Sequence, residues 1–454
     1  MLGALLLLFI GPFIHASAQN VDPVYNYCKR FAHQSTVKNG FLWIDGGTQV
    51  YIHSNDYGST TGQPVIGPNT AIIGISMTRD WNWTADIEEH EYYKYNGRTS
   101  LGNKIPMVAR AGLVGGGAGD NNIYLFGGTT LSVNSSFTPN PLPDSESYFM
   151  WAFDTGLHTW TEYLGDRLGA TALSKPNSGA SAEAPDQAMA FYIGGQIDAG
   201  SSLATQGLGQ SFMISGMMVI STSNQSGINV STAGVSRFPR TRGEAVYLSN
   251  VGKYGGLVLL GGIQQSLRDT SFDGKVDLVS LGTVDIFDIG SLQLQLHNNT
   301  NQSLSQSQQP QSPIWYQQNA TGDVPAARMN FCAIYVAAPD NSSHQIYIYG
   351  GRDHTQFFDD VYVLTMPAFV WVRLYQNDSV RAFHRCHLVG VGNGQSQMLS
   401  VGGTNDTDFE KGCDWEDKGV AIYNLNTGEW GPAYEAHAPA YVVPDRILNI
   451  TGGT

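Results

Sequence analysis

Histidine and aspartate side chains that could bind a metal ion gather in one part of the sequence. They are His354, His384 and His387, together with Asp353 and either Asp359 or Asp360. Imidazole nitrogens and carboxylate oxygens are usual ligands of transition-metal ions. However, the chain has no Gly-x-Ser-x-Gly elbow, no His-Glu-x-x-His helix and no paired-carboxylate signature. The sequence therefore predicts no catalytic residue.

The N-terminus has the pattern of a secretory signal peptide at residues 1–18. Leu5–Ile10 is an apolar core, and Ala16-Ser17-Ala18 matches a signal-peptidase site. Sequons for N-glycosylation support passage through a secretory pathway. The expected acceptors are Asn82, Asn134, Asn224, Asn229, Asn298, Asn301, Asn319, Asn341, Asn377 and Asn405. Asn449 also lies in a sequon, but within an apolar strand pattern, so we expect it to stay unmodified.

Four cysteines in a secreted chain suggest two disulfides. Cys386 and Cys413 fall within the same stretch, so we expect them to pair. Cys28 and Cys332 would then pair by elimination.

The elements that position these residues are set by a recurring pattern, a short apolar strand that ends in a glycine pair. Such runs are typical of buried strands, and glycine reaches positive φ with little steric cost. A weaker seventh copy lies at Ile447–Gly453. The six clear pairs are Gly46–Gly47, Gly127–Gly128, Gly194–Gly195, Gly261–Gly262, Gly350–Gly351 and Gly402–Gly403.

Further strands surround each pair. Downstream, an aromatic or leucine residue is followed seven positions later by another, as in Phe153 and Trp160 or Tyr423 and Trp430, which fits two strands and a tight turn. Upstream of several pairs an arginine precedes a strand. These arginines are Arg30, Arg110, Arg240, Arg328 and Arg381. Each unit therefore predicts about four antiparallel strands.

This succession of strands resembles the kelch repeat over residues 30–450, and the form with a signal peptide and many sequons resembles secreted and cell-surface fungal kelch proteins. The resemblance implies an all-β propeller of six four-stranded blades, or seven if the last glycine pair counts. We expect one propeller domain over 19–454, with a low-complexity loop at 298–313 and the tail Tyr441–Thr454 pairing into the first blade. Polar residues that follow a glycine pair in kelch units bond their own loops, so we expect no metal and no cofactor.

The resemblance implies a binding scaffold for protein or glycan partners on a loop face. One alternative is a copper radical oxidase of the galactose oxidase type, which would need a cysteine cross-linked to a tyrosine. Another is a different secreted enzyme that acts from the propeller face. The arginines ahead of the strands would bridge neighbouring blades or line the channel, or else form a ring for an acidic ligand.

Charge limits the partners further. The formal net charge of −14 opposes binding to nucleic acid or to an anionic membrane. No transmembrane span or hydrophobic GPI-type tail follows the repeats, which favours free secretion or retention in the cell wall. We also expect the protein to be a monomer.

Overall fold

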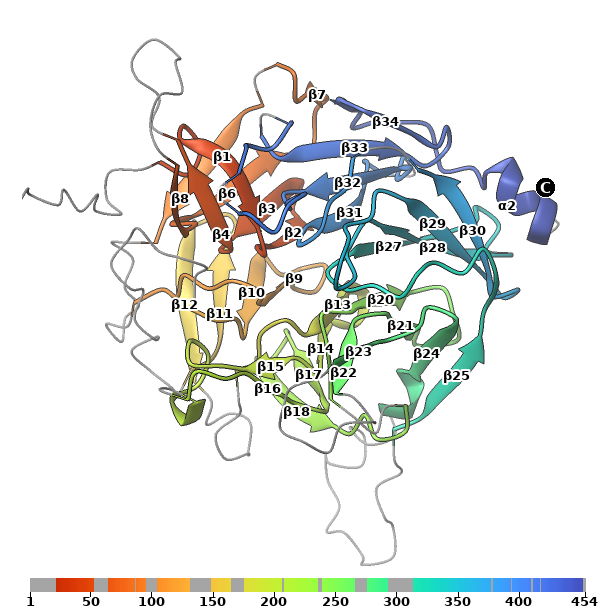
Figure 1. The fold of residues 1–454 in the computed structure, drawn as a ribbon, viewed down its shortest axis with the longest axis horizontal. Helices are drawn as coiled ribbons and strands as arrows, with labels where there is room; N and C mark the ends of the chain where they lie inside the picture. The colour runs from red at the N-terminus through yellow and green to blue at the C-terminus, as the bar shows by residue number, and fades with distance from the viewer. Residues whose placement is uncertain are drawn as a thin grey trace, which may run out of the picture.

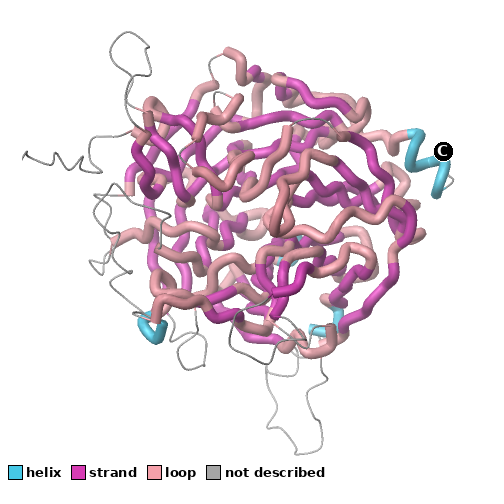
Figure 2. Tube along the Cα trace, viewed as in Figure 1, coloured by secondary structure: helices cyan, strands magenta, loops and turns pink. Residues whose placement is uncertain are grey.

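The structure is a computed structural model. It describes residues 22–52, 64–85, 87–94, 104–130, 148–164, 175–205, 208–235, 239–265, 276–292, 313–376, 379–392, 394–409, 411–416 and 418–451. Strands make up nearly all of its regular structure (Figure 2). The predicted signal peptide lies outside the described residues.

Six antiparallel sheets are each built from one stretch of sequence, with strands paired in chain order. Sheet 1 contains β2 (Gln34–Lys38), β3 (Phe41–Asp45), β6 (Ala71–Ser76) and β8 (Glu89–Tyr93). Sheet 2 contains β9 (Gly112–Gly115), β10 (Asn122–Phe126), β11 (Tyr148–Asp154) and β12 (Thr159–Leu164). Sheet 3 contains β13 (Ala180–Ala184), β14 (Met189–Ile193), β17 (Met217–Ser221) and β18 (Ser226–Val230).

The second half of the chain repeats this arrangement. Sheet 4 contains β20 (Glu244–Leu248), β21 (Gly256–Leu260), β24 (Thr283–Asp288) and β25 (Trp315–Asn319). Sheet 5 contains β27 (Cys332–Ala337), β28 (His344–Tyr349), β29 (Val361–Met366) and β30 (Val370–Tyr375), with β26 (Thr321–Gly322) parallel to β30. Sheet 6 contains β31 (Arg385–Val389), β32 (Gln397–Val401), β33 (Val420–Asn424) and β34 (Glu429–Gly431).

Shorter strands form small sheets beside the six main ones. β1 (Tyr27–Phe31), β4 (Thr48–Tyr51) and β5 (Val65–Pro68) form one small sheet, and β19 (Arg240–Thr241), β22 (Ile263–Gln265) and β23 (Val276–Leu278) form another. β15 (Gln196–Ile197) pairs with β16 (Phe212–Met213), and β7 (Trp81–Asn82) pairs with β35 (Ala433–Tyr434). Short 3-10 turns cover Pro185–Gln187 and Leu203–Thr205.

The six sheets follow one another around a common centre, and the last sheet lies beside the first (Figure 1). Apolar clusters fill the space between consecutive sheets. Leu257 of sheet 4 packs with Phe191 of sheet 3, for example, and Leu399 of sheet 6 packs with Ile44 of sheet 1. The core is therefore divided among the contacts between neighbouring sheets.

The glycine pairs explain how neighbouring sheets are joined. All twelve glycines have positive φ, from 51° at Gly261 to 105° at Gly403. The second glycine of each pair donates its N–H to a carbonyl ahead of the next sheet, at 2.7–3.0 Å. The donor and acceptor pairs are Gly47 with Val108, Gly128 with Pro176, Gly195 with Arg240, Gly262 with Arg328, Gly351 with Arg381 and Gly403 with Arg30. The series ends at the segment ahead of sheet 1, where it began, so we name it the glycine circle.

A second circle lies at the start of the inner strands. Six residues with left-handed backbones, φ 54–61°, donate to one another's carbonyls at 2.7–3.0 Å. We call these residues the inner ring. They are Ala32, Arg110, Ser178, Arg242, Asn330 and Phe383.

The prediction that the tail Tyr441–Thr454 pairs into the first sheet is wrong. Residues 445–451 do not add a strand to the first sheet but form the helix α2 (Asp445–Thr451), which follows Pro444 and contacts β30 (Figure 1). Pro444 accepts the first helical bonds from Ile447 and Leu448, and Ile447 is buried among residues of sheets 5 and 6. The ends of the chain are linked instead by the pairing of β35 with β7 and by a disulfide described below.

Candidate functional site

A cavity of about 470 Å³ lies at the centre of the six sheets and is lined by their innermost strands, β2, β9, β13, β20, β27 and β31. A smaller cavity of about 40 Å³ is lined by the inner ring, just ahead of the same strands. The two cavities share Glu244 and Arg385 in their linings. They therefore follow one another along the axis, with the smaller one at the N-terminal ends of the inner strands.

An ion pair crosses the channel where the two cavities meet. Arg385 of sheet 6 donates to the Glu244 carboxylate of sheet 4 at 3.1 Å, although sheet 5 lies between these two sheets in chain order. Burial raises the pKa of Glu244 to about 7, and Arg385 opposes that shift. This pair was not identified from the sequence, because a residue at the start of a strand gives no sign of its partner two units away.

Two further titratable groups line the larger cavity. Burial raises the pKa of the Glu183 carboxyl to about 7, against the stabilising bond that the Gly115 N–H donates to it. Burial, with the charge of Arg385, lowers the pKa of His387 to about 3. His387 lies 2.8 Å from the Ser35 hydroxyl through its Nε2 atom. Near neutral pH the cavity thus offers a neutral imidazole and carboxyls that can donate or accept a proton.

The observed disulfides differ from the predicted pairing. Cys28 is bonded to Cys413, and Cys332 to Cys386. The first bond joins β1 to a segment of the sixth unit, where the Asp414 N–H also donates to the Cys28 carbonyl at 2.8 Å. The second joins the adjacent inner strands β27 and β31 in the cavity wall. The prediction failed because proximity in sequence was taken as proximity in space.

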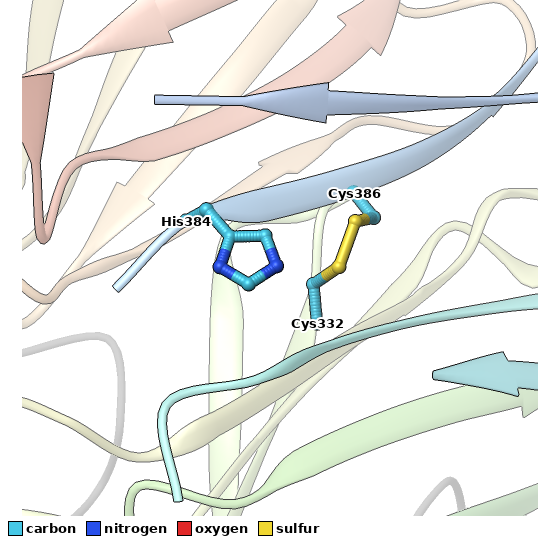
Figure 3. Close-up of side chains that lie close together, drawn as sticks. All are labelled: Cys332, His384 and Cys386. Carbon is cyan, nitrogen blue, oxygen red and sulfur yellow. A yellow bond between two sulfur atoms is a disulfide. The ribbon is translucent and has the colours of Figure 1, made fainter. Parts of the chain in front are cut away.

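His384 lies beside the Cys332–Cys386 disulfide (Figure 3). Neither of its ring nitrogens has a hydrogen-bond partner, and burial holds its pKa well below the usual range. Because both sulfurs are engaged in the disulfide, they are not thiolate ligands, and this group does not fit a metal ion. The same bonds leave no cysteine for the tyrosine cross-link of a galactose oxidase.

The other residues considered as metal ligands are not brought together. Asp353 accepts bonds from Thr355 and Gln356 in its own loop, and Asp360 is paired with Arg328. Within the described ranges, only Cys332, His384 and Cys386 form a group with the proximity of a metal site.

Four of the five predicted arginines have structural roles within their own units. Arg240 pairs with Asp285 at 2.6 Å, Arg328 with Asp360, and Arg381 with Asp414 and Glu416, whereas Arg30 donates to Gln49 at 2.9 Å. Each bond stays inside one unit, so the expectation that these side chains bridge neighbouring blades is wrong. Arg110 does not occupy the position equivalent to the other four arginines. Each of those lies two residues before a member of the inner ring, whereas Arg110 is itself a member.

Candidate glycosylation sites lie at the surface wherever the structure describes them. Asn224, Asn229, Asn319, Asn341 and Asn405 are exposed, and Asn82 is half-buried. Asn449 is exposed in α2, so the expectation that it lies within an apolar strand is wrong. Asn134, Asn298, Asn301 and Asn377 lie outside the described residues, as do residues 298–312 of the predicted low-complexity loop.

Comparison with known proteins was made with both sequence and structure. No protein-family model matches the chain. The chain is 22% identical over 485 aligned positions to a kelch repeat-containing protein of Arthroderma benhamiae, covering 95% of this chain and 62% of that protein. The resemblance to kelch-repeat proteins is confirmed. The kelch-like chain thus spans less than two thirds of the length of this relative.

The solved structure of YjhT has a TM-score of 0.51 with the chain. The alignment covers 90% of this chain and 99% of YjhT at 11% identity, so it shows a shared fold alone. None of the described helices combines the length and apolarity that crossing a membrane would require.

Proposed function

We propose that the chain is a six-bladed propeller, one domain over residues 19–454, that acts as a binding scaffold for protein or carbohydrate partners. The glycine circle and the inner ring support a count of six, because each contains six bonds and returns to its starting segment. Apolar contacts between sheets 6 and 1 support closure.

One observation carries the binding function. The closed backbone frame surrounds a cavity of about 470 Å³ that has both apolar and polar side chains in its wall and the Arg385–Glu244 pair at one end. A cavity of this size with a few convergent polar groups is typical of a ligand site. Tyr247 and Tyr335 in its wall add aromatic surface of the kind on which a sugar ring or a partner side chain packs.

We further propose that the protein is a secreted, monomeric glycoprotein that is released from residues 1–18 and acts outside the cell or at the cell wall. Two disulfides are typical of proteins that fold in an oxidising compartment. Exposure of Asn224, Asn319 and Asn405 supports their use as glycan acceptors.

The test uses full-length protein secreted from a fungal host. Intact mass before and after glycosidase treatment reports glycosylation, and N-terminal sequencing locates cleavage. The mature protein is then screened against a glycan array, an insoluble cell-wall fraction and purified secreted proteins. Binding to a defined partner supports the scaffold, and a folded, glycosylated protein without any partner in these three sets argues against it.

A matched pair of variants locates the binding site. Ser181→Trp places an indole in the cavity, whereas Ser226→Trp places the same side chain on the outer strand β18. We expect the first variant to lose the partner and the second to keep it. Equal binding by both would exclude the cavity as the site.

A further inference from the structure

Three arginines gather at the inner-ring end of the channel. Arg110 and Arg242 belong to the inner ring, and both line the smaller cavity. Arg242 reaches the Met329 sulfur through its Nη1 atom at 3.9 Å. Arg352 is held against the same residue, because the backbones of Met329 and Arg352 exchange two hydrogen bonds at 2.9 Å. The fold thus brings together residues that lie far apart in the sequence.

These arginines lack the carboxylate partners that four other arginines have. Arg240, Arg328, Arg381 and Arg385 each have a carboxylate within ion-pair distance. In the described part of the chain, no carboxylate lies within ion-pair distance of Arg110, Arg242 or Arg352. Burial lowers the pKa of Arg110, and the charge of Asp198, which lies beyond ion-pair distance, opposes that shift. Glu244 is engaged with Arg385, so it does not neutralise Arg242.

The environment of Arg242 is unfavourable to its charge. Burial lowers its pKa to about 10, and the charges of Arg110 and Arg352 act in the same direction. A poorly solvated guanidinium without a counterion is destabilising, and such uncompensated costs cluster at functional sites. It is also unusual in a chain of net charge −14, where carboxylates outnumber the available cations.

An independent observation points to the same place. The side-chain Nδ2 of Asn330 is buried and has no hydrogen-bond partner, and Asn330 lines the smaller cavity with Arg110 and Arg242. A buried donor without an acceptor costs about 1–3 kcal/mol. The smaller cavity is therefore lined by two arginines without a carboxylate partner and by one amide whose N–H donors are unpaired.

We infer that Arg110, Arg242 and Asn330 form a binding site for a carboxylate group at the inner-ring mouth of the channel, and that the nearby charge of Arg352 attracts the anion. The Arg352 guanidinium itself is held by its own loop, because its Nε donates to the Asp353 carbonyl at 2.9 Å. An oxyanion accepts from several N–H donors at once, and a carboxylate matches the planar guanidinium fork. A volume of about 40 Å³ admits a head group of this size. With Asp198 acting on Arg110, the remaining positive charge suits one singly charged carboxylate group better than one doubly charged phosphate group.

This inference deepens the proposed binding function and rests on it, because it names the chemistry and the end of the channel at which a partner is recognised. Both an acidic protein segment and a uronic-acid unit of a glycan carry the required group. The site is separate from the Ser181 region of the larger cavity, so the two can be tested independently.

The experiment measures binding of defined probes to the mature protein by calorimetry at low ionic strength. The probes are a capped tetraglutamate peptide, the matching tetraglutamine peptide, citrate and inorganic phosphate. We expect tetraglutamate and citrate to bind and tetraglutamine not to. Arg242→Met should weaken binding of tetraglutamate about tenfold or more, as expected for loss of a charge-assisted hydrogen bond.

Arg373→Met is the matched control, because Arg373 is also without an ion-pair partner in the described ranges but lies exposed on β30. It should leave all affinities unchanged. Arg352→Met, in a surface loop, provides a second test should Arg242→Met fail to fold. The thermal midpoint is also informative, since removal of an uncompensated charge should not lower it, whereas loss of a structural arginine would.

Three results would overturn the inference: no binding of either carboxylate probe, equal tetraglutamate affinity in wild type and Arg242→Met, or tighter binding of phosphate than of citrate. A partner that Arg242→Met retains and Ser181→Trp loses would also reject this site while leaving the scaffold function in place.

Discussion

Replacement of Gly194 by alanine tests whether the glycine circle holds the sheets together. Gly194 has φ +62°, and a Cβ added to it would lie 2.0 Å from the carbonyl oxygen of Arg240, ahead of the next sheet. Gly195 donates its N–H to that same oxygen at 2.9 Å. The added methyl group must therefore push apart two segments that this bond holds together.

The expected loss of stability has two parts. A left-handed backbone costs an alanine about 1–2 kcal/mol, of which the smaller conformational freedom of unfolded alanine offsets about 0.4–1 kcal/mol. Separation of the two segments loses one hydrogen bond and leaves buried polar groups unpaired, which costs about 1–3 kcal/mol more. We therefore expect Gly194→Ala to lower the free energy of unfolding by about 3 kcal/mol.

Gly252→Ala separates these two parts. Gly252 has φ +66°, but no atom lies within 4 Å of its added Cβ. Only the backbone cost applies to Gly252→Ala. Its free energy of unfolding should therefore be about 2 kcal/mol higher than that of Gly194→Ala, a roughly 30-fold difference in the unfolding equilibrium. Urea unfolding followed by tryptophan fluorescence, with disulfides intact, measures both. Equal urea midpoints for the two variants would refute the role of the close approach.

Three further predictions concern buried groups. Lys94 and Asp45 form an ion pair whose side chains are both fully buried, so Lys94→Met should destabilise by about 3–5 kcal/mol, and adding Asp45→Asn should restore most of the loss in urea unfolding. Because the folded pKa of Glu183 is raised to about 7, its favourable contribution is complete below the unfolded value and is lost as pH rises through 7. Glu183→Gln should then be more stable than wild type at pH 8 but equal to it at pH 4, and a pH-independent difference would contradict this. Peptide mapping without reduction should find Cys28–Cys413 and Cys332–Cys386, and a Cys386–Cys413 peptide would contradict the structure.

The repeat units could be predicted from the sequence because their signals are local. An apolar run predicts a strand, and the glycine pair that ends it predicts positive φ, whatever lies elsewhere in the chain. Even the third unit, which has neither a tryptophan in its last strand nor an arginine just ahead of its first strand, forms the complete sheet 3. The failure at Ile447–Thr451 has the same origin, since an apolar run of this length fits either a strand or a short helix, and Pro444 with the buried Ile447 decides for α2.

The candidate site depended on contacts between units, which no local pattern records. Arg110 and Arg240 look alike in sequence, but a shift of two positions places one in the inner ring and the other against Asp285. Likewise, Arg385 meets Glu244 only because the sheets are arranged around one axis.

The sequence by itself determined an all-β chain of repeated four-stranded units, because backbone preference and apolar patterning act within a few residues. Only the tertiary structure decided the partners of the cysteines, the raised pKa of Glu183 and the grouping of two arginines with the unpaired amide of Asn330 around the smaller cavity. These properties depend on distance and burial, and folding brings Cys28 to Cys413 across 385 residues of chain.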